Sequence, residues 1–259
     1  METIFEVRGL TVWYDRPVVR GVSFSVSAGE LIGVLGLNGC GKTTLLRGIV
    51  GAAGRTEGEV LVRGEPVLAL RVRERAKRIA MLPQRIEVMP GVRVGEVIGM
   101  GCYARAGFLG RLGPQERARV REAAARFGLT ALLETDCALL SEGQRQLTQL
   151  ARLFVQNAPV LLLDEPNSAL DFLNSHRLFR MVRDMLAETG GAGAAVLHDP
   201  ALALRYCDRL LLMEAGRLIG AARPAAMDAP ALQAALRRLY PGLSVKQDKA
   251  GGAFTCTLD

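Results

Sequence analysis

The chain has 259 residues, of which 49% are hydrophobic and 23% are charged, a composition that excludes disordered and fibrous proteins. Its formal net charge of +7 raises the question of nucleic-acid binding. However, the basic stretches "RVRERAKR" (71–78) and "RLGPQERARVREAAARF" (111–127) alternate with helix formers rather than aromatic residues. They therefore indicate solvated helix faces, and we predict no nucleic-acid partner.

The segment before residue 30 and "GEVLVRGEPV" (58–67) are typical of antiparallel strands with tight turns. The start, "METIFEVRGLTVWYD", alternates like a strand and lacks the apolar stretch of a signal peptide. No apolar run approaches the ~20 residues that a helix needs to cross a bilayer, so we expect a cytosolic chain. The five cysteines form no Cys-x-x-Cys pair and accompany only two histidines, which indicates reduced structural thiols rather than a zinc site.

Three short apolar runs lead into chemically distinctive features: the first into a glycine-rich turn, the second into two acids and the third into His198. They are "ELIGVLG" (30–36), "VLLLDEP" (160–166) and "AAVLHDP" (194–200). Continuous apolar runs of this length are typical of buried parallel strands, whose ligands bind beyond the carboxyl ends. The sequence therefore predicts an α/β core with a single ligand site.

The remaining segments predict two additions to this core. Residues from about 90 to 157 are mainly helix formers and predict an inserted helical subdomain. "LLLMEAGRLIGAA" (210–222) predicts a hairpin that turns at Ala215 and Gly216. After it we expect a helix at 230–240 and a last hairpin around Gly251 and Gly252. These elements divide the chain into a main domain, 1–223, and a short extension, 224–259.

"GLNGCGKT" (36–43) matches the glycine-rich phosphate-binding loop, with Gly36, four residues, and then Gly41, Lys42 and Thr43. Glycines let backbone N–H groups surround phosphates without a Cβ clash. Lys42 is expected to reach the β- and γ-phosphates, and the Thr43 hydroxyl to ligate Mg²⁺. The loop follows a predicted strand and precedes the helical run "TTLLRGIVG", which is the context that this motif requires.

"VLLLDEP" supplies two acids at the end of a buried strand. Asp164 is placed to support the Mg²⁺ ion. Glu165 is placed to orient and deprotonate an attacking water, a role that contributes about 10²–10⁴ in rate. Without a phosphate-binding loop, two solvated acids at a strand end would be the better interpretation.

"LLSEGQRQL" (139–147) predicts a helix N-terminus closed by a capping box between Ser141 and Gln144. Such a terminus offers free N–H groups and the positive end of a helix dipole to an anion. Glu142 stands in the middle of this segment, and its carboxylate would compete with an anion if it pointed inward.

Together these motifs resemble the nucleotide-binding subunits of ABC transporters, in the family's order and along essentially the whole chain. The resemblance implies a P-loop NTPase core of the ABC type, an α/β fold with an antiparallel β subdomain and an inserted helical subdomain. It places an adenine-stacking aromatic at Tyr14, although the adjacent Trp13 is an alternative. Gln84 in "MLPQ" matches the glutamine loop, "NSALD" (167–171) the loop that crosses the dimer interface, and His198 the switch histidine that contacts the γ-phosphate.

The resemblance identifies "LSEGQ" as the signature that grips the nucleotide of a second, head-to-tail subunit. Glu142 departs from the commonest form, Leu-Ser-Gly-Gly-Gln. Two unit charges about 4 Å apart repel by about 4 kcal/mol at an effective dielectric of about 20, so an inward carboxylate would oppose closure. We therefore expect Glu142 to point to solvent and to pair with Arg145, leaving Ser141 and Gly143 to contact phosphate.

The resemblance thus implies a full set of site residues. The catalytic residues are Glu165, His198 and Gln84, and the metal is held by Thr43, Gln84 and Asp164. The residues expected to bind ATP are Tyr14, Gly36, Asn38, Gly39, Cys40, Gly41, Lys42, Thr43, Thr44, Ser141, Gly143 and Gln144.

Several looser matches in the later segments resemble importer ATPases for metal chelates such as siderophore-iron, haem and cobalamin. The implied assembly is a homodimer at the cytoplasmic face of the membrane, with two permease subunits on separate chains and a substrate-binding protein. Two alternatives stay open at this point. One is a soluble ABC ATPase of the iron–sulfur assembly type, and the other is an ATP-sensing module with little hydrolysis.

Overall fold

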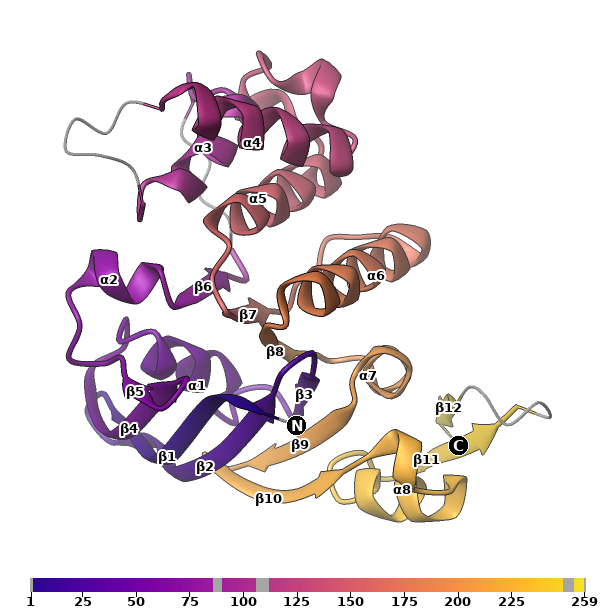
Figure 1. The fold of residues 1–259 in the computed structure, drawn as a ribbon. Helices are drawn as coiled ribbons and strands as arrows, with labels where there is room; N and C mark the ends of the chain where they lie inside the picture. The colour runs from indigo at the N-terminus through magenta and orange to yellow at the C-terminus, as the bar shows by residue number, and fades with distance from the viewer. Residues whose placement is uncertain (1, 86–89, 106–111, 249–253, 259) are drawn as a thin grey trace.

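The computed structural model describes residues 2–85, 90–105, 112–248 and 254–258 (Figure 1). In this part of the chain, two sheets form the body of the molecule. The first is a four-stranded antiparallel sheet, and in spatial order its strands are β2 (Pro17–Ser27), β1 (Thr3–Trp13), β4 (Arg55–Val62) and β5 (Glu65–Pro66). The predicted antiparallel strands before residue 30 and at 58–67 are therefore confirmed.

The second sheet carries the three apolar runs at its centre. Its six strands within the described residues are, in order, β10 (Arg217–Ala222), β9 (Arg209–Glu214), β3 (Leu31–Leu35), β8 (Ala192–Val196), β7 (Val160–Asp164) and β6 (Ile79–Leu82). The strands from β9 to β6 are mutually parallel, and β10 is antiparallel to β9. Ala215 and Gly216 both have positive φ at the β9–β10 turn, which confirms the predicted hairpin.

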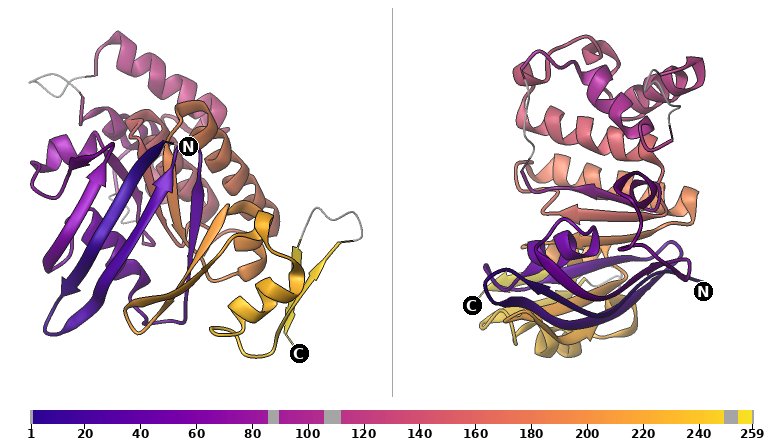
Figure 2. Two further views of the ribbon diagram at one scale, coloured as in Figure 1. Left: turned by 60° about the horizontal axis from the view of Figure 1, so that its bottom comes forward. Right: turned by 90° about the vertical axis from the view of Figure 1, so that its left-hand side faces the viewer.

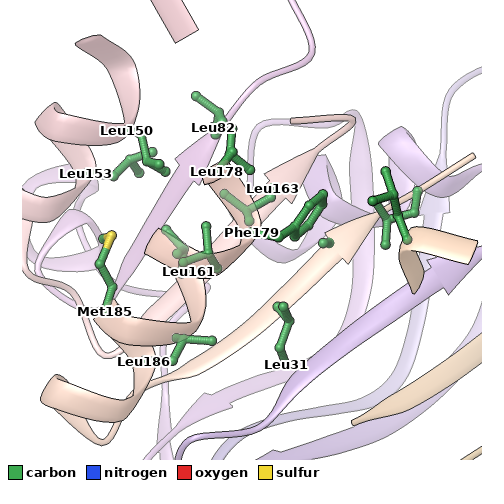
Figure 3. Packing of buried hydrophobic residues seen from close by; sticks show 14 of the residues in the cluster. Leu31, Leu82, Leu150, Leu153, Leu161, Leu163, Leu178, Phe179, Met185 and Leu186 are labelled. Carbon is green, nitrogen blue, oxygen red and sulfur yellow. The ribbon is translucent and has the colours of Figure 1, made fainter. Parts of the chain in front are cut away.

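The central strands β3, β7 and β8 are buried on both faces, because successive side chains enter different cores. Leu31 and Leu35 of β3 lie in one hydrophobic cluster, whereas Ile32 and Val34 lie in the other. The second cluster fills the space between the two sheets together with α1 (Lys42–Ile49). Figure 3 shows the first cluster, where side chains of β3, β6 and β7 meet those of α5 (Glu142–Gln156) and α6 (Phe172–Thr189).

A helical segment lies between β6 and β7, as the sequence predicts for residues 90–157. Its α3 (Val94–Gly99) and α4 (Pro114–Arg126) pack on α5, and α5 in turn contacts β6 and α6. Figures 1 and 2 show these helices on the side of the second sheet that faces away from the first sheet. The short helix α2 (Val72–Ala76) precedes β6, in the first basic stretch. Part of the second basic stretch lies outside the described residues.

The C-terminal extension forms a separate small layer beside β10 (Figure 1). It contains α8 (Ala229–Leu236) and the antiparallel pair β11 (Leu243–Gln247) and β12 (Phe254–Leu258). The predicted helix and final hairpin are thus present, although Gly251 and Gly252 lie outside the described residues. β12 contacts α7 (Pro200–Tyr206), the helix that follows β8. None of the helices described in the structure is both long and apolar enough to cross a membrane.

Candidate functional site

The phosphate-binding loop joins the end of β3 to the start of α1. A Cβ at Gly36 would lie 2.3 Å from the Met213 carbonyl oxygen and 2.7 Å from Cys40 Sγ, so only glycine fits there. Gly39 and Gly41 adopt φ values of 77° and 106°, a region that L side chains rarely occupy. The glycines of the motif therefore have two physical roles: Gly36 permits a close approach of the backbone, and Gly39 and Gly41 permit left-handed turns.

Lys42 and Thr43 open α1 and point their polar groups toward the loop and the next strands. The Lys42 ammonium donates to the carbonyl oxygens of Gly36 at 2.7 Å and Leu37 at 3.2 Å, and the residue is only 5% exposed. The Thr43 hydroxyl donates to Asp164 Oδ1 at 3.0 Å. The loop cation and the strand-end acid are thus parts of one site, although 121 positions separate Thr43 from Asp164.

Asp164 ends β7 and is 1% exposed. Burial raises the pKa of its carboxyl above the ordinary value, while the bond from Thr43 acts in the opposite direction. A carboxylate in such a position is stabilised by a nearby cation, which is the arrangement that a metal-supporting acid needs.

Glu165 is the centre of a second set of contacts. Gln84 Nε2 donates to Glu165 Oε2 at 2.6 Å, and His198 Nε2 lies 2.5 Å from Glu165 Oε1. These three predicted residues come from the segments after β6, β7 and β8, which are neighbours in the sheet. The structure therefore brings together the acid, the glutamine and the histidine, which lie in three separate segments of the sequence.

The backbone of Glu165 is strained in a way that aims its side chain. Its φ is 51°, a left-handed value that costs a non-glycine residue about 1–3 kcal/mol. Its N–H donates to the Val196 carbonyl at 3.2 Å, which anchors the residue to the end of β8. Leu197 N–H in turn donates to the Val34 carbonyl of β3 at 3.2 Å. These bonds align the ends of β7, β8 and β3 around the phosphate-binding loop.

These groups line a cleft of about 360 Å³ above the carboxyl ends of the strands. The lining residues are Val18, Asn38, Gly39, Gly41, Lys42, Thr43, Thr44, Gln84, Glu165 and His198. All of them except Val18 are predicted site residues. Val18 lies in β2 of the other sheet, and no sequence pattern marks it, because only the packing of the two sheets brings it to the cleft. Tyr14, Gly36, Cys40 and Asp164 do not line this cleft.

Tyr14 is 51% exposed just after β1. The neighbouring Trp13 has a buried indole N–H, so Tyr14 is the more accessible of the two aromatic residues. Its role in adenine stacking stays a prediction.

The signature segment forms the N-terminus of α5, away from the cleft. Ser141 is the N-cap residue: its Oγ accepts from Gln144 N at 3.3 Å, and its own N–H donates to Gln144 Oε1 at 3.0 Å. The predicted capping box is therefore confirmed. The side chain of Glu142 is 49% exposed, and its Oε2 lies 3.0 Å from Arg145 Nη1, which is the predicted pairing. A Cβ at Gly143 would lie 3.3 Å from Leu170, in the predicted interface loop.

The donor set of the cleft is suited to a hard cation that is shared with phosphates. The described residues hold no group of three or more histidine, cysteine, aspartate or glutamate side chains that could bind a metal by themselves. Mg²⁺ is commonly held by one or two protein oxygens, waters and substrate phosphates. The Thr43 hydroxyl beside the Asp164 carboxylate fits that pattern.

Comparisons with known proteins agree with this architecture. A family model described as "ABC transporter" matches residues 19–168. The chain is 41% identical over 226 residues to the hemin import ATP-binding protein HmuV of Pseudomonas fluorescens, covering 83% of this chain and 82% of that protein. It is 39% identical over 217 residues to the protein of the same name from Streptomyces coelicolor, covering 84% and 76%.

A third relative is longer than this chain. The cobalamin import ATP-binding protein BtuD of Halobacterium salinarum is 38% identical over 241 residues, which cover 93% of this chain and 59% of that protein. The chain thus spans less than two thirds of the length of this relative.

Two solved structures share the fold at low sequence identity. A chain of a metal-chelate type ABC transporter in an inward-facing conformation has a TM-score of 0.81 at 22% identity, covering 100% of this chain and 97% of that chain. A dimeric ATP-binding cassette in a post-hydrolysis state, bound to ADP and Pi, has a TM-score of 0.77 at 22% identity, covering 86% and 100%. The family model, the relatives and the geometry of the loop agree, and the chain belongs to the ABC transporter family.

Proposed function

We propose that this chain is the ATP-hydrolysing subunit of a membrane ABC importer for a metal chelate such as siderophore-iron, haem or cobalamin. The observation that carries the proposal is the position of Glu165, which contacts both Gln84 and His198 at a cleft lined by Lys42. The names of the curated relatives, hemin and cobalamin import ATP-binding proteins, favour import over the soluble assembly ATPase.

The residues in and around the cleft have separate roles in hydrolysis. Lys42 and the loop N–H groups bind the phosphates, and the ammonium neutralises their charge. Thr43 and Asp164, with Gln84, would hold Mg²⁺, which supplies charge neutralisation at the β- and γ-phosphates. Glu165 orients the attacking water and accepts its proton, and His198 keeps the carboxylate in place and faces the γ-phosphate. Tyr14 stacks on the base.

The signature residues act on a second copy of the chain. In one molecule Ser141 and Gly143 do not line the cleft, and the Ser141 N–H is already bonded to Gln144 Oε1, so the Ser141 hydroxyl and the Gly143 N–H are the donors proposed to meet the nucleotide of a head-to-tail partner. The proposed assembly is a homodimer that binds two permease subunits and receives cargo from a substrate-binding protein, at the cytoplasmic face of the membrane. Residues 1–223 form the ATPase domain with its helical insertion at about 90–157, and residues 224–259 form the extension.

Two measurements test this function. Single-turnover hydrolysis of Mg·ATP by the purified chain, with and without membrane partners, separates an ATPase from an ATP sensor, because a sensor releases no phosphate. A tagged pull-down from detergent-solubilised membranes then identifies the partner. Capture of a polytopic membrane protein is the expected result, whereas a soluble partner with no membrane protein would support the assembly-factor alternative.

Replacing Glu142 by glycine is expected to change the rate of ATP hydrolysis by only about two- to fivefold. The carboxylate is half exposed and paired with Arg145, so the substitution removes an exposed ion pair that contributes about 0–1 kcal/mol. Steady-state phosphate release over a range of ATP concentrations measures the effect. A gain of a hundredfold or more would show that Glu142 restrains the site.

A further inference from the structure

Arg145 is the most connected side chain of the signature segment. Its Nη1 donates to Glu142 Oε2 at 3.0 Å, its Nη2 to the Ala138 carbonyl at 3.1 Å and its Nε to the Cys137 carbonyl at 3.3 Å. One guanidinium in the first turns of α5 thus binds the chain that leads into that helix. The two carbonyls belong to the 3-10 turn Cys137–Leu139, which Leu140 separates from the N-cap Ser141.

The same turn is fastened from its other side by Asp136. The Asp136 carboxylate accepts from Ala138 N and from Gly91 N, both at 2.8 Å, and these bonds hold its pKa below the ordinary value. Asp136 therefore accepts a hydrogen bond from an N–H group of the turn, and Arg145 donates hydrogen bonds to two of its carbonyl oxygens. Residues 137–141, which we term the signature turn, are held between these two anchors.

The geometry requires an arginine rather than a positive charge alone. A guanidinium presents its donors in a planar fork, so that it can reach a carboxylate and two carbonyls at once. A lysine ammonium at the end of a flexible stem has no such preset geometry. The contact with Glu142 also compensates the carboxylate that stands at the first position of the helix.

We infer that Arg145 is a positioning residue that sets the signature turn, and through it Ser141, for contact with the nucleotide of a second copy of the chain. This inference rests on the proposed function and extends it to a residue outside the cleft. Arg145 does not line the cleft of its own molecule. It acts through the backbone of residues 137–141 and through its pairing with Glu142.

The test uses the full-length chain in a Glu165→Gln background, where slow hydrolysis leaves the Mg·ATP dimer intact. Dimer formation is measured by analytical ultracentrifugation over a range of protein concentrations, and Mg·ATP affinity is measured on the dilute monomer. Arg145→Ala is expected to raise the protein concentration for half-dimerisation at least tenfold, with monomer affinity within twofold of the parent. Arg145→Lys is expected to raise the protein concentration for half-dimerisation by a similar factor.

Two further variants separate the charge of Glu142 from the carbonyl contacts and control for the loss of an exposed ion pair. Glu142→Gln combined with Arg145→Ala is expected to lower the protein concentration for half-dimerisation about threefold relative to Arg145→Ala alone. The unpaired carboxylate is then gone, but the two carbonyls still lack their donor. Lys77→Ala is the matched control, since Lys77 pairs with Glu74 across the same three-residue spacing at 2.7 Å, remote in sequence from the signature. It is expected to dimerise like the parent.

Normal dimerisation of Arg145→Ala would overturn the inference. Parent-like dimerisation of Arg145→Lys, or of the Glu142→Gln, Arg145→Ala double variant, would also overturn it, because the effect of Arg145 would then be one of charge alone. An equal loss of monomer affinity would also overturn it, because Arg145 would then merely support the fold. If the Glu165→Gln parent itself fails to dimerise with Mg·ATP, the proposed function fails and the inference fails with it.

Discussion

Replacing Glu165 by glutamine is expected to lower the rate of ATP hydrolysis by about 10²–10⁴-fold. The amide keeps the size of the side chain and still accepts a hydrogen bond from Gln84, but it cannot take a proton from water. Since the loop that binds phosphate is untouched, ATP should stay bound, and the dimer that it bridges should accumulate. Single-turnover phosphate release and the mass of the ATP-bound species in solution measure the two effects.

The control for this experiment is the affinity of the dilute protein for Mg·ATP, which should match that of the parent. His198→Ala provides a useful comparison, because it removes the other contact of the carboxylate at Oε1. It should slow hydrolysis while leaving Glu165 available as a base. Hydrolysis by the Glu165→Gln variant at the parent rate would show that another residue is the base.

Replacing Lys42 by methionine is expected to weaken ATP binding by about 100-fold or more. Methionine replaces most of the unbranched apolar stem but removes the terminal ammonium. A hydrogen bond to a charged group contributes about 1.5–3 kcal/mol, and about 1.4 kcal/mol corresponds to a factor of ten. Loss of two such contacts to phosphate oxygens therefore accounts for the expected change.

Isothermal titration of the monomer with Mg·ATP measures this loss, and thermal unfolding shows whether the variant retains its fold. Lys77→Met is the matched control, because Lys77 carries the same charge in an exposed pair with Glu74. Its affinity should equal that of the parent. Unchanged ATP binding by Lys42→Met would exclude the phosphate-binding role of the loop lysine.

The features that depend on neighbouring residues could be predicted from the sequence. The loop at 36–43, the hairpin turn at Ala215 and Gly216 and the capping box of Ser141 and Gln144 each arise from short-range geometry. A turn needs residues that tolerate positive φ, and a cap needs an acceptor at a defined distance along the chain. Residue type and spacing specify these conditions completely, which is why the predicted elements and the structure agree there.

The contacts between elements could not be predicted in the same way. Thr43 bonds to Asp164 across 121 positions, and Gln84 bonds to Glu165 across 81 positions. The family resemblance nominated these residues for one site, but it did not specify which atoms would meet. The positive φ of Glu165 could not be predicted either, because the identity of a non-glycine residue does not indicate a left-handed backbone conformation.

By itself, the sequence determined the chemical groups of the site: a glycine-rich loop that carries a lysine and a threonine, two acids at a strand end and a histidine after another strand. Only the tertiary structure decided that Gln84 and His198 share the carboxylate of Glu165, that Val18 lines the cleft and that Arg145 binds the carbonyls of the signature turn. The physical reason is that spacing along the chain governs bonds within a turn, whereas strand order and packing decide which distant atoms come within hydrogen-bonding distance.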